Sequence, residues 1–366
     1  MSGGLALSRP LLQWLREDPA WRQLPIALRA RLHWQAGWGS VNARLSGATA
    51  HGADAPAVLQ DPLLIVGPWR SGTTVMHELL VAATGCATPL TWQCMNACAF
   101  QLGAPRRATA TMARPMDGLE IRHDSPQEDE FALLTLGVPS AYRGFWMPHR
   151  MGELHATLSP DFWLDNTEWL PIWEAFLRGV LRSSGAVARP PLILKSPNHS
   201  FRLPAILRRF PRARVVWMAR SAGDVMASNR KMWRAMFERH GLTPADGAPL
   251  DGFLAAALDG AAQALAWCET HLPAAQWTVV RHDAMVAAPQ ETTRAVCRQL
   301  MADIEIDEPA LAQAVAQTAS GRIERYAAAP REHDATARAI EELDAAQARA
   351  AARFGLATTT MHAVVP

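Results

Sequence analysis

Short runs of consecutive apolar residues recur along the chain, and each run is followed by a stretch whose apolar positions have helical spacing. A strand that is apolar at every position is buried on both faces, as the strands of a parallel sheet are. After the first run, apolar residues return at Val75, Leu79, Leu80 and Ala83, and this helical pattern ends at Gly85. Because strands and helices alternate in this way, the pattern predicts an α/β fold with a central parallel sheet. The expected strands cover residues 62–66, 191–195, 213–218 and 277–281.

The same pattern divides the chain into an expected core domain and two flanking parts. Residues 1–60 show helical patches and predict an N-terminal helical extension, whereas residues 331–366 predict a C-terminal helix and tail. Between them, residues 61–330 form the expected domain, with helices on both faces of the sheet. Residues 139–185 carry four tryptophans and interrupt the alternation of strands and helices. We expect them to form a helical cap inserted over the carboxyl edge of the sheet, where ligands bind in open α/β folds.

Composition and charge exclude several classes of protein. The 366 residues include 36 Lys and Arg and 34 Asp and Glu, so the net charge of +2 argues against a dedicated nucleic-acid binder. No apolar run approaches the ~20 residues that a bilayer span needs, and the N-terminus lacks the features of a signal peptide. The five cysteines form no disulfide pattern, and no motif adds metal ligands to Cys94 and Cys98. We therefore expect a cytoplasmic protein without a metal.

Basic residues dominate the expected N-terminal extension. Before residue 50 the only acidic residues are Glu17 and Asp18, whereas the arginines number six: Arg9, Arg16, Arg22, Arg29, Arg31 and Arg44. A basic helix of this kind either forms the solvated outer face of a domain or lies on a membrane surface. We expect the solvated face, with peripheral membrane contact as the alternative.

A glycine-rich turn follows the first expected strand and carries the clearest chemical signal. It reads Gly67-Pro68-Trp69-Arg70-Ser71-Gly72-Thr73-Thr74 and leads directly into a helix. Backbone N–H groups of such a turn bind anions together with the N-terminus of the helix. The nucleotide-triphosphatase pattern GxxxxGKS/T has a lysine where this chain has Thr73, and that lysine contacts the terminal phosphates. The turn therefore argues against ATP hydrolysis and predicts an anion site that uses Arg70 and hydroxyl groups without a metal.

A second group of polar residues follows the next two expected strands. Lys195-Ser196-Pro197-Asn198-His199 ends the strand at 191–195, and Arg220 leaves the carboxyl end of the strand at 213–218. Ser228 lies about two turns into the helix that follows Arg220. Arg220 and Ser228 can bind a second, separate phosphate. The alternative is that Arg220 forms an ion pair with Asp224 in the first turn of that helix.

Taken together, these segments resemble the sulfotransferases that use 3′-phosphoadenosine-5′-phosphosulfate (PAPS). Arg70–Thr74 resembles their 5′-phosphosulfate loop, Arg220 and Ser228 resemble their 3′-phosphate motif, and the segment 195–199 resembles a block of the bacterial branch, as does the segment 124–133. The resemblance covers roughly residues 62–302. It implies a P-loop-like fold of three layers, PAPS as donor, adenosine 3′,5′-bisphosphate as product and no metal. One departure is Ser221-Ala222-Gly223, which stands where many relatives have Asp-Pro and a further residue.

The implied binding site uses Arg70, Ser71, Gly72, Thr73, Thr74, Arg220 and Ser228. In sulfuryl transfer the leaving oxygen gains negative charge, and Arg70 and Lys195 are expected to stabilise it. The acceptor hydroxyl must lose a proton to a base within hydrogen-bond reach. We favour His199 as this base, because it follows the strand that carries Lys195 and imidazole titrates near neutral pH.

Two glutamates are alternative bases, since some relatives use a carboxylate. Glu128 also matches the third position of a helix capping box that begins at Ser125. Glu130 lies two residues further on and is expected on the opposite side of that helix, where it can orient the imidazole of His199.

The acceptor is only weakly encoded. Tryptophans between residues 146 and 173, together with Arg143 and Arg150, predict an amphiphilic pocket, and hydroxyls of small molecules, lipids and sugars all remain open. The rival functions are a nucleotide kinase and a non-catalytic nucleotide-binding protein, and Thr73 argues against the first. The sequence does not encode the oligomeric state.

Overall fold

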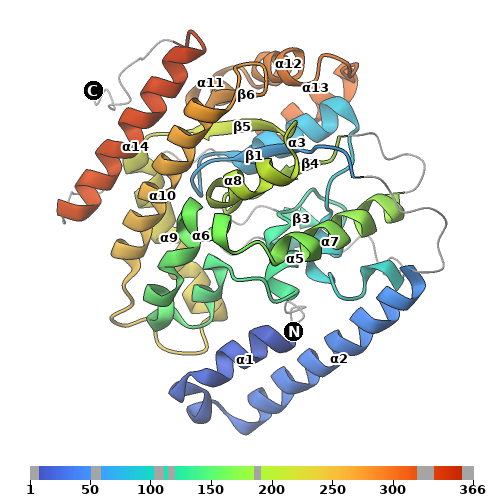
Figure 1. Cartoon of the computed structure of the whole chain (residues 1–366), viewed down its shortest axis with the longest axis vertical. Coiled ribbons are helices and arrows are strands. Elements are labelled where there is room, and N and C mark those ends of the chain that lie inside the picture. The colour runs from blue at the N-terminus through green and yellow to red at the C-terminus, as the bar shows by residue number, and fades with distance from the viewer. Residues whose placement is uncertain are drawn as a thin grey trace.

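The computed structural model describes residues 8–50, 59–102, 111–113, 120–184, 191–319 and 334–356. Its central sheet has four parallel strands in the order β4-β1-β5-β6, seen edge-on in the upper half of Figure 1. The strands are β1 (Leu63–Val66), β4 (Ile193–Lys195), β5 (Arg214–Ala219) and β6 (Trp277–Arg281). Each strand begins and ends within two residues of a predicted apolar run, so the predicted parallel sheet is confirmed.

Alternate residues of the strands are buried in two separate hydrophobic cores, one on each face of the sheet. On β1, Leu63 and Ile65 join the core formed with α3, α11, α12 and α13. Leu64 and Val66 join the larger core, which includes α8, α9, α10 and α14. Because both faces are covered by helices, the strands have no solvent-facing side, and this explains their uninterrupted apolar sequence. The three-layer arrangement predicted from the sequence is confirmed.

Helices cover both faces of the central sheet. On the smaller core lie α3 (Thr73–Thr84), α11 (His282–Ala287), α12 (Pro289–Leu300) and α13 (Glu308–Ala319). On the larger core lie α8 (His199–Arg209), α9 (Ala222–His240), α10 (Leu250–His271) and α14 (Asp334–Arg353). α14 falls within residues 331–366, where a C-terminal helix is expected, and it packs against α10, β6 and α9.

Residues 139–185 form short helices that pack on α8, α9 and α10. The described elements are η3 (Ala141–Phe145), η4 (Pro148–Leu158), α6 (Pro160–Asp165) and α7 (Trp169–Ser184). α6 packs on α8, and η4 packs on α10. Ahead of them lie α4 (Thr91–Met95), η2 (Phe100–Leu102), α5 (Glu130–Thr135) and a two-stranded antiparallel sheet of β2 (Thr111–Ala113) and β3 (Glu120–Arg122).

The described part of the N-terminal extension is helical. It contains α1 (Arg9–Glu17), the short 3-10 helix η1 (Pro19–Gln23) and α2 (Ile26–Ala50). In Figure 1 α1 and α2 form the end of the molecule furthest from the sheet. Within the described residues, no helix combines the length and the apolar character needed to cross a membrane.

Candidate active site at the β1 turn

The turn after β1 has a backbone that only glycine can adopt at two of its positions. Gly67 has φ +130°, and a Cβ there would lie 2.5 Å from the carbonyl oxygen of Met218 on β5. Gly72 has φ +96°, and its Cβ would lie 2.8 Å from the ring of His282. Arg70 adopts φ 70°, a left-handed conformation that is uncommon outside glycine. The two predicted glycines are thus required by close packing and by the turn itself.

Two neighbouring helices fix the path of this turn. Ser200 on α8 accepts a hydrogen bond from the Gly67 N–H at 2.9 Å and lies 3.2 Å from the Gly67 carbonyl. Asn229 on α9 donates to the carbonyl of Trp69 at 2.9 Å. Ser71 Oγ is buried and has no hydrogen-bond partner among the described residues. The turn therefore presents an unsatisfied hydroxyl beside backbone N–H groups, which fits an anionic ligand.

The predicted cations of the two phosphate sites lie together at this turn. Arg70 Nε donates to Ser228 Oγ at 3.1 Å, and Arg220 donates to the carbonyl of Arg70 at 2.9 Å. Arg220 also lies 3.9 Å from the carboxylate of Asp224, so the alternative ion pair exists beside the contact with the turn. Burial and the charge of Arg220 lower the pKa of the adjacent His282 to about 4, so this imidazole is neutral at physiological pH.

The C-terminal helix holds the strand end that carries Arg220. The side chain of Gln347 on α14 accepts from the Arg220 N–H and donates to the Arg220 carbonyl, both at 3.0 Å. Asp344 on the same helix accepts from the Ala222 N–H at 2.8 Å, at the start of α9. Ser221 at the N-cap of α9 makes no capping hydrogen bond of its own.

Lys195 and Glu128 form an ion pair next to the turn. Lys195 Nζ lies 2.7 Å from Glu128 Oε1 and 3.3 Å from Thr74 Oγ1 in the first turn of α3. Tyr142 donates its hydroxyl to Glu128 Oε2 at 2.8 Å. Burial and the negative charge of Glu128 raise the pKa of Tyr142 well above its usual value, so the phenol stays a hydrogen-bond donor. Glu128 is 13% exposed, whereas Lys195 is 2% exposed.

His199 lies in a fully buried position beside Asp129. Its Nε2 lies 2.8 Å from Asp129 Oδ2, which also accepts a hydrogen bond of 2.6 Å from the indole N–H of Trp173. The Nδ1 of His199 faces a guanidinium N–H of Arg202 at 3.5 Å. Since arginine can only donate, this contact is compatible with Nδ1 as the acceptor and Nε2 as the donor to Asp129. Both ring nitrogens are occupied, and both side chains of the His199–Asp129 pair are 0% exposed.

Glu130 and Arg202 form a second buried ion pair. Arg202 donates to both carboxylate oxygens of Glu130 and, at 3.0 Å, to the carbonyl of Pro139. Its guanidinium lies 4.3 Å from the ring centre of Trp163 and 5.1 Å from that of Trp169. Trp163 and Trp169, predicted as lining of an acceptor pocket, thus pack over a buried cation.

Three consecutive acidic residues therefore meet three basic side chains in the same order. We call the contacts Glu128–Lys195, Asp129–His199 and Glu130–Arg202 the side-chain ladder. Four of its six members, Glu128, Glu130, Lys195 and His199, are predicted from the sequence. The other two members, Asp129 and Arg202, are not predicted, nor are the pairing and the nearby Tyr142 and Ser200. A signal was available for one of the missed residues, because Arg202 lies three positions after His199, which is the spacing of one helical face.

The capping box predicted at Ser125 does not form. α5 begins at Glu130 and not at Pro126, because the preceding residues pair with an extended segment. Leu90 forms a β-bridge with Pro126, and the Gln127 N–H bonds to the carbonyl of Pro89 at 2.9 Å. Glu128 is consequently free of a capping role and turns its carboxylate to Lys195.

Arg143 and Arg150, predicted to face the acceptor, bind the N-terminal extension. Arg150 lies over the ring of Trp14 at 4.2 Å and donates to the Trp14 carbonyl, and Arg143 lies 5.6 Å from the same ring. The prediction failed because the partner that these arginines share, Trp14, is more than 100 positions away in the chain. Cys94 and Cys98 are buried free thiols, and the described residues contain no cluster of three or more His, Cys, Asp or Glu side chains arranged for a metal.

Comparisons with known proteins agree on one family. The sequence profile described as "Sulfotransferase family" matches residues 62–308. Omega-hydroxy-beta-dihydromenaquinone-9 sulfotransferase Stf3 of Mycobacterium bovis and the protein of the same name in Mycobacterium tuberculosis are 33% identical over 193 residues. That match covers 51% of this chain and 49% of each relative, so the chain spans about half the length of the curated relatives it matches.

Two solved structures share the fold at low sequence identity. Sulfotransferase STF9 from Mycobacterium avium superposes with a TM-score of 0.59 at 18% identity, over 94% of this chain and 88% of that one. Sulfotransferase STF1 from Mycobacterium tuberculosis gives 0.57 at 18% identity, over 92% of this chain and 90% of that one. Since the family profile covers most of the chain, including the turn and every member of the side-chain ladder, this protein belongs to the sulfotransferase family.

Proposed function

We propose that this sulfotransferase takes its sulfuryl group from PAPS and binds the two ends of that nucleotide at the two cation sites. The turn 67–74 would hold the 5′-phosphosulfate, with Arg70 and the unpartnered hydroxyl of Ser71 as its ligands. Arg220 and Ser228 would hold the 3′-phosphate. The observation that carries this proposal is the contact chain from Ser228 to Arg70 to Arg220, because it joins both sites at one turn.

We propose Glu128, and not His199, as the base. The acceptor oxygen forms a bond to sulfur, the bond from sulfur to the bridging phosphate oxygen breaks, and the acceptor proton goes to a nearby base. His199 is fully buried and has both ring nitrogens engaged, which argues against proton transfer from an acceptor. Glu128 lies at the turn, one hydrogen bond from the Lys195 ammonium that also contacts Thr74.

The ion pair between Glu128 and Lys195 supports the same assignment. A proton taken up by Glu128 would weaken its hold on Lys195. The ammonium would then be available to the leaving phosphate oxygen, where charge develops.

We propose a lipid-like molecule with a hydroxyl group as the acceptor class. This rests on the relatives named for omega-hydroxy-beta-dihydromenaquinone-9, which match this chain over about half of their length.

Ligand-induced stabilisation tests the nucleotide assignment. Adenosine 3′,5′-bisphosphate in the presence of a chelator should raise the melting temperature more than adenosine 5′-monophosphate does. At about 100 times its dissociation constant, a ligand adds about 2.7 kcal/mol of stability. Arg220→Ala should abolish the preference for the 3′-phosphate, and Arg234→Ala, at an exposed arginine on α9, is the matched control. A larger shift with ATP and magnesium would instead support a kinase.

A further inference from the structure

The outer face of α2 carries large apolar side chains in solvent. Ile26 is 77% exposed, Trp34 67%, Trp38 56% and Val41 45%. The rings of Trp34 and Trp38 stack in parallel with centres 6.1 Å apart. At 3.6 residues per turn, these four positions fall within about one third of the circumference of the helix. We call this stripe the α2 apolar face.

The α2 apolar face is unusual within the described part of the molecule. Among the described residues, seven large hydrophobic side chains are exposed, and four of the seven lie on this face. A fifth, Leu102, is 45% exposed on η2, which packs against α2. On its inner side α2 is anchored by Leu32 and Ala36, both buried in the larger core. A helix that is apolar on both sides normally has a second partner for its outer side.

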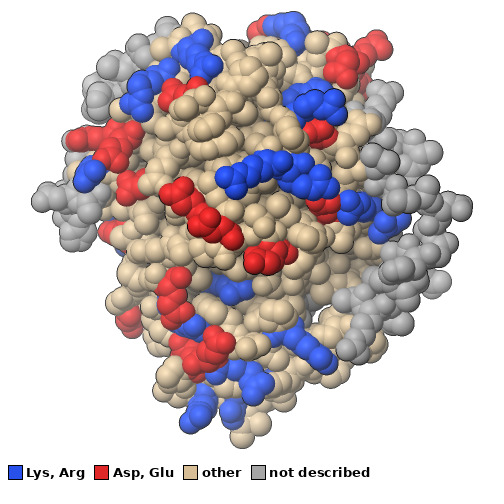
Figure 2. Space-filling view, viewed as in Figure 1, with Lys and Arg blue, Asp and Glu red and all other residues tan. Residues whose placement is uncertain are grey.

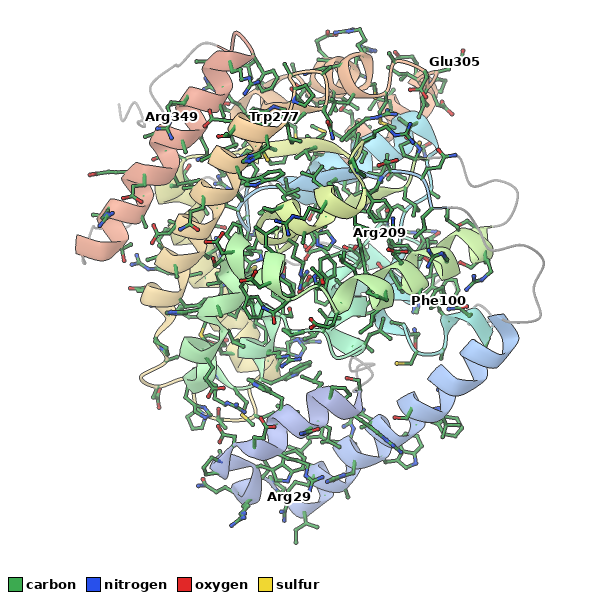
Figure 3. The ribbon with its side chains drawn as sticks, viewed as in Figure 1. Arg29, Phe100, Arg209, Trp277, Glu305 and Arg349 are labelled. Carbon is green, nitrogen blue, oxygen red and sulfur yellow. The ribbon has the colours of Figure 1, made fainter. Side chains whose placement is uncertain are left out.

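Positive charge surrounds this face. On the helical wheel Arg29 and Arg31 fall on the two edges of the stripe, and Arg22 lies just before the helix. Asp18 is turned inward, with its carboxylate 2.7 Å from His149 and 3.7 Å from Arg150. Figure 2 shows Lys and Arg side chains gathered at this end of the molecule, and in Figure 3 Arg29 is labelled there, on the edge away from the sheet.

We infer that the α2 apolar face docks on an anionic membrane surface. Exposed tryptophans flanked by arginines match the headgroup region of a bilayer, where the indole ring has one apolar and one polar environment. The arginines would contact lipid phosphates. A second copy of this chain fits less well, because stacking two α2 faces would bring the arginines of both copies together.

Docking in this way would hold the protein at a membrane in which a lipid acceptor is dissolved. That consequence rests on the proposed function, whereas the docking itself rests only on α2.

Flotation with lipid vesicles tests the inference. The protein should float with phosphatidylcholine vesicles that contain phosphatidylglycerol, should float less with phosphatidylcholine alone, and should lose binding as salt is added. Replacing both arginines, Arg29→Gln with Arg31→Gln, should weaken binding about 30-fold. Trp34→Ser with Trp38→Ser should weaken it by at least about tenfold. Ile172→Ser with Val286→Ser, at exposed apolar positions elsewhere, is the matched control and should bind as the wild type does.

Three results would overturn the inference. One is that the arginine double variant and the tryptophan double variant both bind vesicles as strongly as the control variant does. Another is a wild-type protein that does not float at all. The third is a dimer in light scattering that the tryptophan pair dissociates, which would assign the face to a second copy. The arginine pair keeps the test valid if the tryptophan variant does not fold. Nucleotide-induced shifts of the melting temperature should be the same in all these variants. Those shifts test the proposed function, and flotation tests membrane docking, so the two can fail independently.

Discussion

The two ends of the side-chain ladder contain the same chemistry in different surroundings. At one end Glu130 and Arg202 are 0% and 1% exposed, enclosed by tryptophan rings and a backbone carbonyl. At the other end Glu128 is 13% exposed and its partner Lys195 reaches the turn through Thr74. A fully enclosed ion pair is costly to break and has no room to exchange protons. A pair at the edge of the site can open, and this difference in position is why we propose Glu128, and not Glu130, as the base.

The largest effect is expected from changing Glu128, the proposed base at the more exposed end of the side-chain ladder. Glu128→Gln keeps the shape of the side chain but removes the basic group. The amide oxygen can still accept from Lys195, and the amide NH₂ can donate to the Tyr142 hydroxyl, in the reverse of the present direction. Single-turnover sulfuryl transfer should fall about 10²–10⁴-fold, while the melting shift with adenosine 3′,5′-bisphosphate is retained. A variant His199→Gln that loses transfer while Glu128→Gln stays active would reverse the assignment of the base.

The enclosed end should affect folding more than catalysis. Arg202→Met leaves Glu130 as a buried unpaired carboxylate and should lower the free energy of unfolding by about 3–5 kcal/mol, measured by chemical denaturation. In the double variant Arg202→Met with Glu130→Leu no charge is left unpaired, so most of that loss should be recovered. If the single and double variants were equally unstable, the ion pair would not be the source of the loss.

The middle of the ladder should make stability depend on acid pH. Burial alone would raise the pKa of Asp129, but His199, Trp173 and Arg202 outweigh it and hold the pKa below its usual value of 3.8. A depressed pKa in the folded state contributes stability above the unfolded pKa, and that stability is lost as the pH falls through the folded pKa. Asp129→Asn should cost about 2 kcal/mol at neutral pH.

To test this, the free energy of unfolding is measured for the wild type and for Asp129→Asn between neutral and strongly acid pH. The difference between wild type and Asp129→Asn should shrink as the pH falls below about 4. A difference that stays constant over this range would mean that the charge of Asp129 contributes nothing.

The smallest effect is expected at Ser200, which lies outside the side-chain ladder and whose hydroxyl holds the turn at Gly67. Ser200→Ala removes both contacts with Gly67 and should cost about 1 kcal/mol, with a several-fold loss of affinity for adenosine 3′,5′-bisphosphate in calorimetry. Ser184→Ala is the control, because its hydroxyl only bonds to the carbonyl of Val180 in its own helix. Equal nucleotide affinities of the two variants would remove Ser200 from the binding site.

Sequence patterns predicted the sheet and the turn because both depend on local features. A strand buried on two faces must be apolar throughout, and Gly67 and Gly72 are required by the backbone. The pairing of residues 128–130 with β4 and α8 depends instead on the bridge between Leu90 and Pro126, which sets the register of an irregular segment. No local pattern encodes that bridge, so His199 was favoured as the base from its place after β4 alone. Arg143 and Arg150 were misassigned for a similar reason, since their partner Trp14 belongs to a distant helix.

The contact of Asp344 with the start of α9 has a consequence for how the chain tolerates mutation. Ser221 stands where many sulfotransferases have an aspartate, and here a carboxylate from α14 accepts the Ala222 N–H instead. The two positions should therefore show compensatory epistasis: Asp344→Ala alone weakens the start of α9, and adding Ser221→Asp restores a carboxylate to the same helix end. A residue near the end of the chain would thus decide which residues are acceptable beside Arg220.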